Sequence, residues 1–91
     1  MADPIRAEDL ALYFFEACPY CVRVRHALER LGLQIELRDI REEPRYRQEL
    51  VAARGRGTVP VLRIRSAEGD RWMPESADIV RYLEERFAPS R

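Results

Sequence analysis

Two cysteines three positions apart are the residues of this chain best suited to chemistry. Cys18 and Cys21 lie between an apolar run typical of a buried strand, Leu12–Phe15, and a segment with helical apolar spacing, Val22–Leu31. We therefore expect Cys18 just before a helix and Cys21 in its first turn. The unpaired N–H groups and the dipole at a helix N-terminus favour an anion. Cys18 should thus be mostly thiolate at neutral pH, with Cys21 as its redox partner.

The residues between and after the cysteines suit the same site. Pro19 lacks an N–H and has its φ preset for the first helical turn, so it can begin the helix without losing a donor. The ring of Tyr20 can shield the sulfur atoms, and Arg23 and Arg25 add positive charge nearby. This stretch is therefore predicted to be an active-site loop.

Metal binding and a structural disulfide are the two alternatives for a cysteine pair. Two cysteines supply half of a tetrahedral zinc site, and His26 is the single histidine, so a monomer lacks four such ligands. Residues 1–9 have no apolar core of signal-peptide length, and no segment is long enough to span a membrane. We therefore expect no metal and a reducing, cytoplasmic location, where paired cysteines are more often catalytic.

The length and charge of the chain limit its organisation and its partners. Its 91 residues suit one domain, which we expect to span 1–91, and no repeat or flexible linker divides them. Its 16 basic residues, all arginine, balance 16 acidic ones, so the composition favours neither nucleic acid nor an anionic membrane as a partner. We expect the chain to act as a monomer.

The apolar spacing further along the chain predicts alternating strands and helices in the order βαβαββα. A helix that joins two strands makes them parallel with a right-handed crossover, whereas the last two strands should form an antiparallel hairpin. The fold class is therefore α/β, with a four-stranded mixed sheet and helices on both faces. The expected elements are strands at Leu12–Phe15, Gln34–Arg38, Val61–Ile64 and Arg71–Met73, and helices from Pro19 to Gly32, from Pro44 to a break at Arg54–Gly57, and from Ser76, its cap, to Phe87.

The motifs of this chain, in this element order, resemble those of glutaredoxins, which are small thioredoxin-fold proteins that use glutathione as reductant. The resemblance covers about Leu10–Phe87 and implies a thioredoxin fold. The stretch from Met73 to Leu83 is more similar still to glutaredoxins related to the N-terminal domain of glutathione transferases. The two motifs that carry the resemblance are Cys18-Pro19-Tyr20-Cys21 and Thr58-Val59-Pro60.

This resemblance implies a glutathione-dependent thiol-disulfide oxidoreductase. Cys18 would attack the glutathione sulfur of a protein–glutathione mixed disulfide, and a second glutathione would regenerate it. Cys21 would resolve Cys18 to an internal disulfide when the substrate is a protein disulfide, so it should be dispensable for deglutathionylation. Glutathione is then a co-substrate, no cofactor is permanently bound, and the partners are glutathionylated or disulfide-bonded proteins.

The same resemblance implies where glutathione binds. A cis Val59–Pro60 bond is expected to face the cysteines and to turn the Val59 backbone toward the bound peptide. The N-terminus of the last helix is expected to hold the γ-glutamyl carboxylate, while Glu75 accepts from the ammonium group. The implied contacts are Tyr20, Thr58, Val59, Pro60, Glu75 and Ser76.

One departure from the family concerns the charge beside the first cysteine. Phe15 stands where many glutaredoxins carry a lysine that receives the glycine carboxylate of glutathione. If any group replaces that charge, it must be an arginine, because the chain has no lysine. The candidates are Arg47, Arg54 and Arg56, and Gln48 could serve through its amide.

Three other functions remain open at this point. An iron-sulfur carrier would hold a [2Fe-2S] cluster between two subunits through Cys18 and two glutathione thiols, but Pro19 stands where glycine or serine is commoner in cluster-binding members of the family. A thioredoxin-like protein would be reduced by a flavoprotein reductase, but Ala17 stands where thioredoxins usually have tryptophan. A non-catalytic glutathione-binding module would leave both cysteines unexplained.

Overall fold

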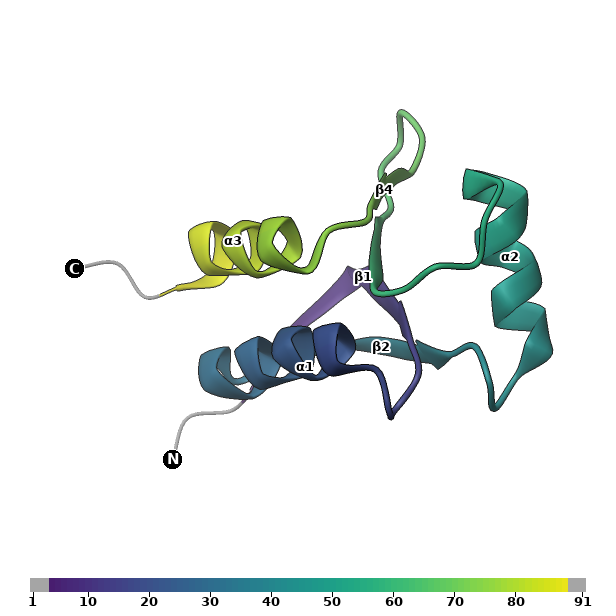
Figure 1. The fold of residues 1–91 in the computed structure, drawn as a ribbon. Coiled ribbons are helices and arrows are strands. Elements are labelled where there is room, and N and C mark those ends of the chain that lie inside the picture. Colours follow the sequence, from purple (N-terminus) through teal and green to yellow (C-terminus); the bar gives the residue numbers. More distant parts are fainter. Residues whose placement is uncertain (1–3, 89–91) are drawn as a thin grey trace.

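A four-stranded sheet organises the computed structural model, which describes residues 4–88. The strands lie in the order β2-β1-β3-β4, with β1 parallel to β2, and β3 antiparallel to both of its neighbours. The predicted βαβαββα order and mixed sheet are confirmed. Within the described residues, no helix has the length and apolar character that a membrane span needs. The elements are β1 (Ile5–Phe14), α1 (Pro19–Leu31), β2 (Leu33–Asp39), α2 (Pro44–Arg54), β3 (Val61–Ile64), β4 (Arg71–Met73) and α3 (Ser76–Phe87) (Figure 1).

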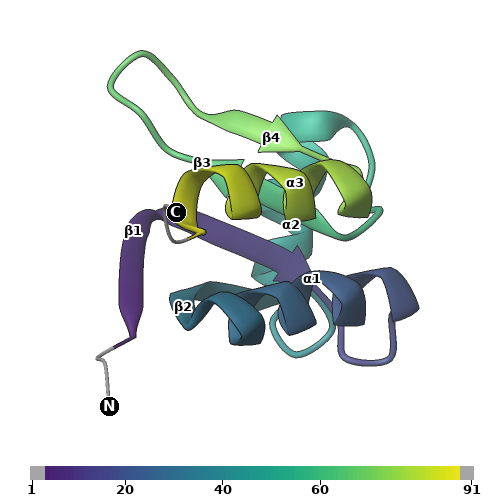
Figure 2. The same cartoon turned by 90° about the vertical axis from the view of Figure 1, so that its left-hand side faces the viewer.

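Helices cover both faces of the sheet. Figure 1 shows α1 and α3 on one side of the strands and α2 on the other, and Figure 2 shows α1 and α3 side by side in front of the sheet. Strand β1 contributes side chains to both faces because successive side chains of a strand point in opposite directions. Its residues Leu10, Leu12 and Phe14 belong to the core under α1 and α3, whereas Ala11 and Tyr13 belong to the cluster under α2.

Local signals bound the helix that carries the cysteines. Cys18 is the N-cap of α1 and Pro19 is its first residue, as predicted. Gly32 takes the left-handed conformation at the C-cap, with φ 61°. Its N–H donates to the carbonyl of Glu29 (3.1 Å), which satisfies one of the terminal acceptors of the helix. The sequence alone therefore placed both ends of α1 correctly.

Strand β1 is longer than the predicted strand. It begins at Ile5 rather than Leu12 and ends at Phe14, so Phe15 lies outside it. Its register against β2 shifts between Arg6 and Ala11, and Figure 2 shows a sharp bend in this part of the strand. Three of the four residues from 6 to 9 are charged, which hides this segment from a search for apolar runs.

The start of α3 corrects one expectation. Ser76 is the first residue of the helix and not its cap. The cap is Glu75, whose side chain makes no capping hydrogen bond. Ser76 is instead buried, while Ile79 and Leu83 hold α3 against the core as expected.

Polar contacts attach α2 to the sheet. Leu50 is the one residue of α2 that is fully buried. The Tyr13 hydroxyl on β1 donates to Glu49 on α2 (2.8 Å) and accepts from Arg38 (3.0 Å) and Arg63 (3.2 Å). Burial, together with the hydrogen bond to Glu49, raises the pKa of Tyr13, so the hydroxyl keeps the proton that it donates. Arg38 also pairs directly with Glu49.

Candidate active site

Cys18 lies at the N-terminus of α1, where the sequence predicted it. Its Sγ accepts a hydrogen bond from the backbone N–H of Cys21 (3.4 Å), so the sulfur itself caps the helix. Both cysteines are free of disulfide, with 5% of Cys18 and 0% of Cys21 exposed. The N–H groups and the dipole of the helix favour negative charge at this position.

The second cysteine is in a different environment. Burial raises the pKa of Cys21 to about 12, its hydrogen bond to Cys18 acts in the same direction, and the positive charge of Arg25 opposes both. Cys21 therefore keeps its proton at neutral pH. Of the two sulfurs, Cys18 is the one at the N-cap of α1.

A hollow of about 400 Å³ lies beside the cysteine loop. Three segments meet there: the first turn of α1, the connection from α2 to β3, and the start of α3 with the residues before it. The Val59–Pro60 peptide bond is cis, as the resemblance implied. The lining contains every residue implied as a glutathione contact, together with three others. It consists of Tyr20, Arg54, Arg56, Thr58, Val59, Pro60, Pro74, Glu75 and Ser76.

Groups of both charges surround this hollow. Arg54 and Arg56 contribute two guanidinium groups, and Glu75 contributes a carboxylate at the N-cap of α3. The Nε of Arg54 is buried and has no hydrogen-bond partner among residues 4–88. The N-terminus of α3 adds a partial positive charge. Among residues 4–88, no three His, Cys, Asp or Glu side chains are grouped as a metal site requires.

The structure distinguishes between the residues that were expected to replace the family's lysine. Arg54 and Arg56 line the hollow, whereas Arg47 and Gln48 are exposed on α2 and are not part of its lining. The Arg47 guanidinium lies instead against Gly57, with its Nε 3.0 Å from the position that a Cβ would take there.

Sequence reasoning missed one cation near the active-site loop. The Arg41 guanidinium stacks 3.8 Å above the ring centre of Phe15, the residue at the position of the family's lysine. The Phe15 carbonyl in turn accepts from the N–H of Cys18 (3.2 Å). Arg41 comes from the segment after β2, and no spacing in the sequence relates it to Phe15. The tertiary structure alone brings this charge to the loop.

Comparison with known proteins identifies one matching family and several similar proteins. The family described as "Glutathione S-transferase, N-terminal domain" matches residues 12–91. Glutaredoxin 2 of Escherichia coli K12 is 29% identical over 75 residues, which are 82% of this chain and 33% of that protein. This chain therefore spans about a third of the length of the curated relatives that it matches.

Solved structures give the same relationship. The trimeric glutathione transferase TDR1 of Leishmania has a TM-score of 0.71 and 33% identity, over 88% of this chain and 18% of that one. A maleylacetoacetate isomerase from Anaeromyxobacter dehalogenans, solved with bound GSH, has a TM-score of 0.66 and 28% identity, over 89% and 39%. The fold is thus the thioredoxin-like fold of these N-terminal domains. Because the family match covers most of its length, the chain belongs to the glutathione S-transferase N-terminal domain family.

Proposed function

We propose that this chain is a glutathione-dependent thiol-disulfide oxidoreductase that reduces protein–glutathione mixed disulfides and protein disulfides. The observation that carries the proposal is the hollow beside the Cys18 loop, which gathers all the implied glutathione contacts. The similarity to Glutaredoxin 2 supports it as well. The proposal treats residues 1–91 as one domain, with glutathione as co-substrate and no permanently bound cofactor.

The charges around the hollow match those of glutathione, which has two carboxylates and one ammonium group. The N-terminus of α3 at Ser76 would receive the γ-glutamyl carboxylate, and Glu75 would accept from the ammonium. Arg54 and Arg56 would receive the glycine carboxylate, which gives the unpaired Nε of Arg54 a partner. The backbone of Val59 would pair with the peptide as an added strand would.

In the proposed reaction, the Cys18 thiolate attacks the glutathione sulfur of the mixed disulfide. A bond forms between Cys18 and that sulfur, the bond to the substrate protein breaks, and the leaving thiolate takes a proton from water. The thiolate of a second glutathione then attacks the glutathione sulfur bound to Cys18. This step releases oxidised glutathione and restores the Cys18 thiolate, so each cycle consumes one free glutathione, while the other half of the oxidised glutathione comes from the mixed disulfide.

Cys21 is proposed to act only when the substrate is a protein disulfide. It would attack the mixed disulfide between Cys18 and the substrate, form an internal disulfide and release the substrate thiol. The raised pKa of Cys21 keeps it protonated during the first attack, so it does not compete with Cys18. Deglutathionylation is therefore expected to proceed without it.

The first test measures reduction of a small glutathione mixed disulfide, with glutathione and glutathione reductase regenerating the reductant. We expect the wild type and Cys21→Ser to turn over and Cys18→Ser to be inactive. A parallel assay follows conjugation of glutathione to an aryl halide. Conjugation without disulfide reduction would replace the proposal with a transferase function.

A second test asks which arginine receives the glycine carboxylate. A charge-assisted hydrogen bond is worth about 1.5–3 kcal/mol, so Arg54→Gln and Arg56→Gln should each raise the KM for the mixed disulfide by about tenfold or more. Arg47→Gln is the matched control, because its side chain lies outside the hollow, and its KM should be unchanged. A raised KM in the control alone would move the carboxylate site to Arg47.

A further inference from the structure

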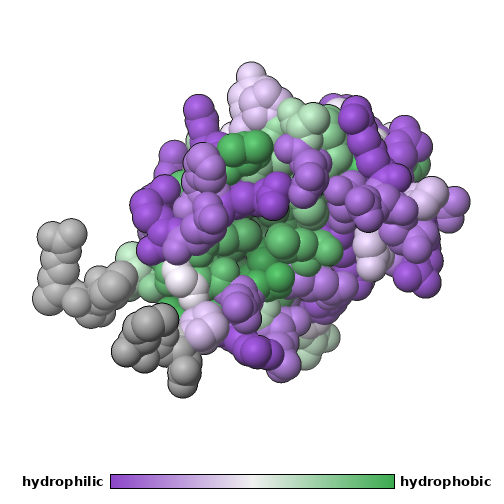
Figure 3. All heavy atoms as spheres, turned by 90° about the horizontal axis from the view of Figure 1, so that it is seen from below, coloured by the Kyte–Doolittle hydropathy of each residue, from purple (hydrophilic) through white to green (hydrophobic). Residues whose placement is uncertain are grey.

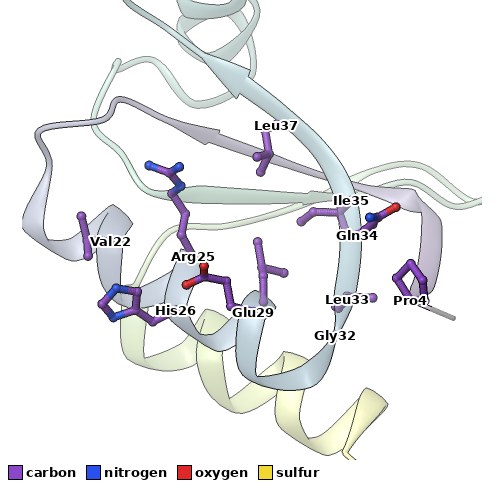
Figure 4. A pocket seen from close by; sticks show the side chains of 11 residues that line it. Pro4, Val22, Arg25, His26, Glu29, Gly32, Leu33, Gln34, Ile35 and Leu37 are labelled. Atoms are coloured by element: carbon purple, nitrogen blue, oxygen red, sulfur yellow. The ribbon is translucent and has the colours of Figure 1, made fainter. Parts of the chain in front are cut away.

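A second hollow, larger than the first, lies on the other side of α1. It has a volume of about 700 Å³ and lies between α1 and β2 (Figure 4). Its floor is apolar, with Leu33, Ile35 and Leu37 from β2 and Val22 and Leu28 from α1. Leu37 is 45% exposed. Seen from the side where Figure 1 places α1 and β2, apolar surface gathers in a green hollow with polar residues around it (Figure 3).

The strand beside this hollow has an open edge. β2 is the outermost strand of the sheet, and among residues 4–88 it pairs only with β1. An unpaired edge of seven residues is a template for another strand. Neither a proline nor a glycine interrupts β2. The apolar hollow and the free backbone groups therefore lie along the same strand.

We propose that two copies of this chain pair through the outer edges of β2, antiparallel and with the two-fold axis at Ile35. In this register Leu33 of one copy lies opposite Leu37 of the other, and Ile35 lies opposite itself. All three side chains are on the face that carries α1, because alternate residues of a strand share a face. The pairing therefore covers the exposed Leu37 with the Leu33 of the second copy and joins the two apolar floors.

The polar residues are also self-complementary in this register. On the opposite face of β2, the amide of Gln34 lies opposite the carboxylate of Glu36, and no like charges are opposed. Arg25 and Glu29 project from α1 beside the hollow, one helical turn apart (Figure 4). A two-fold axis makes the two α1 helices antiparallel, so Arg25 of each copy would face Glu29 of the other if the axis passes midway between these residues. An interface of this kind, in which one patch fits itself, is what a symmetric dimer requires.

The dimer leaves the proposed glutathione site open. No residue that lines the hollow beside Tyr20 also lines the hollow between α1 and β2. The proposal therefore does not rest on the proposed function, and it replaces the monomer that we expected from the sequence.

The test is sedimentation equilibrium of the full chain over a range of concentrations. We expect the wild type to reach twice the 10.7 kDa chain mass. Leu37→Glu should raise the dimer dissociation constant by about 100-fold or more, because the substitution occurs twice across the axis and puts a carboxylate against leucine. Ala67→Glu, in the exposed turn before β4, adds the same charge elsewhere and should leave the constant unchanged. Circular dichroism and thermal unfolding check that both variants are folded.

Cross-linking tests the register separately. In a Cys18→Ser/Cys21→Ser background, Ile35→Cys should give a covalent dimer with a short bis-maleimide, because the two cysteines face each other across the axis. Arg71→Cys, on the opposite edge strand β4, is the matched control and should give no covalent dimer, although it still pairs through β2. A wild type that remains monomeric at every concentration would overturn the proposal, as would a dimer that Leu37→Glu does not weaken. Equal cross-linking at both edges would also overturn it.

Discussion

The two faces of the sheet are held by different kinds of contact. Under α1 and α3, thirteen buried residues of the described chain form an apolar core. Under α2 only five are buried, and one of them is Tyr13, whose hydroxyl joins Glu49 and Arg38. The stabilisation from apolar burial on the first face does not depend on how the groups are oriented, whereas hydrogen bonds on the second face depend on particular atoms.

This difference assigns different tasks to the two faces. The apolar face holds α1, and so it positions Cys18. The polar face holds α2, which leads to Arg54, Arg56 and the cis Val59–Pro60 bond. Damage to the first face should unfold the protein, whereas damage to the second should disturb the segment that lines the hollow before the fold is lost.

The largest effect is expected from a cavity in the apolar core. Leu12→Ala removes a side chain that is 0% exposed and packed under α1 and α3, and such substitutions cost about 3–5 kcal/mol. Urea unfolding of the variant and the wild type measures the loss. A cost below about 1 kcal/mol would mean that this core is not close-packed.

A matched cavity on the other face should cost less. Leu50→Ala also removes a fully buried leucine, but from the smaller cluster, which can collapse more easily around the gap. We expect a loss of about 2–3 kcal/mol in the same urea experiment. If Leu50→Ala proves as costly as Leu12→Ala, the two faces do not differ in packing as we describe.

The polar network can be tested by a substitution that removes one hydroxyl and keeps the aromatic ring in place. Tyr13→Phe removes the hydroxyl that bridges β1 and α2, at a cost of about 1–2 kcal/mol. Because α2 ends at Arg54 and leads into the segment that lines the hollow, KM for the mixed disulfide should rise while kcat changes little. Tyr46→Phe, on the same face, is the control: its hydroxyl makes none of these hydrogen bonds and its ring stays under Arg38, so the variant should change neither stability nor KM. Unaltered kinetics in Tyr13→Phe would separate α2 from ligand binding.

The smallest effect concerns charge on the apolar face. Arg86 on α3 donates to both carboxylate oxygens of Asp9 on β1 (2.9 and 3.1 Å), and these hydrogen bonds lower the pKa of Asp9. A lowered pKa adds stability above the ordinary carboxyl pKa, and this stability is lost as the pH falls through the lowered value. For a pair whose side chains are 36% and 34% exposed, the gain is below about 1 kcal/mol. Urea unfolding at pH 7 and pH 3 should show a smaller acid loss in Asp9→Asn than in the wild type.

Local sequence signals predicted the elements whose ends are set by neighbouring residues. Pro19 and Gly32 bound α1, and Pro44 and Gly55 bound α2, because proline suits the first turn of a helix and glycine its left-handed end. The first half of β1 was missed, since its residues are mostly charged. It is a strand because it pairs with β2 and not because of its own pattern.

The sequence predicted those residues of the candidate site that belong to a motif, and it missed those that only the folded chain brings together. The residues implied as glutathione contacts, from Tyr20 to Ser76, were identified from motifs, and they line one hollow. Sequence could not choose between Arg47 and Arg54, which are both on α2, since the choice depends on which side of the helix faces the loop. The stacking of Arg41 on Phe15 had no sequence signal at all.

The sequence by itself determined the alternation of elements and the position of Cys18 at a helix N-terminus. Both follow from interactions between residues close in the chain, whose geometry is nearly the same in any fold. Only the tertiary structure decided which charges reach the hollow beside Tyr20, how Tyr13 ties α2 to the sheet, and which strand edge stays open. These depend on contacts between residues far apart in the chain, which form only when the packed core places them together.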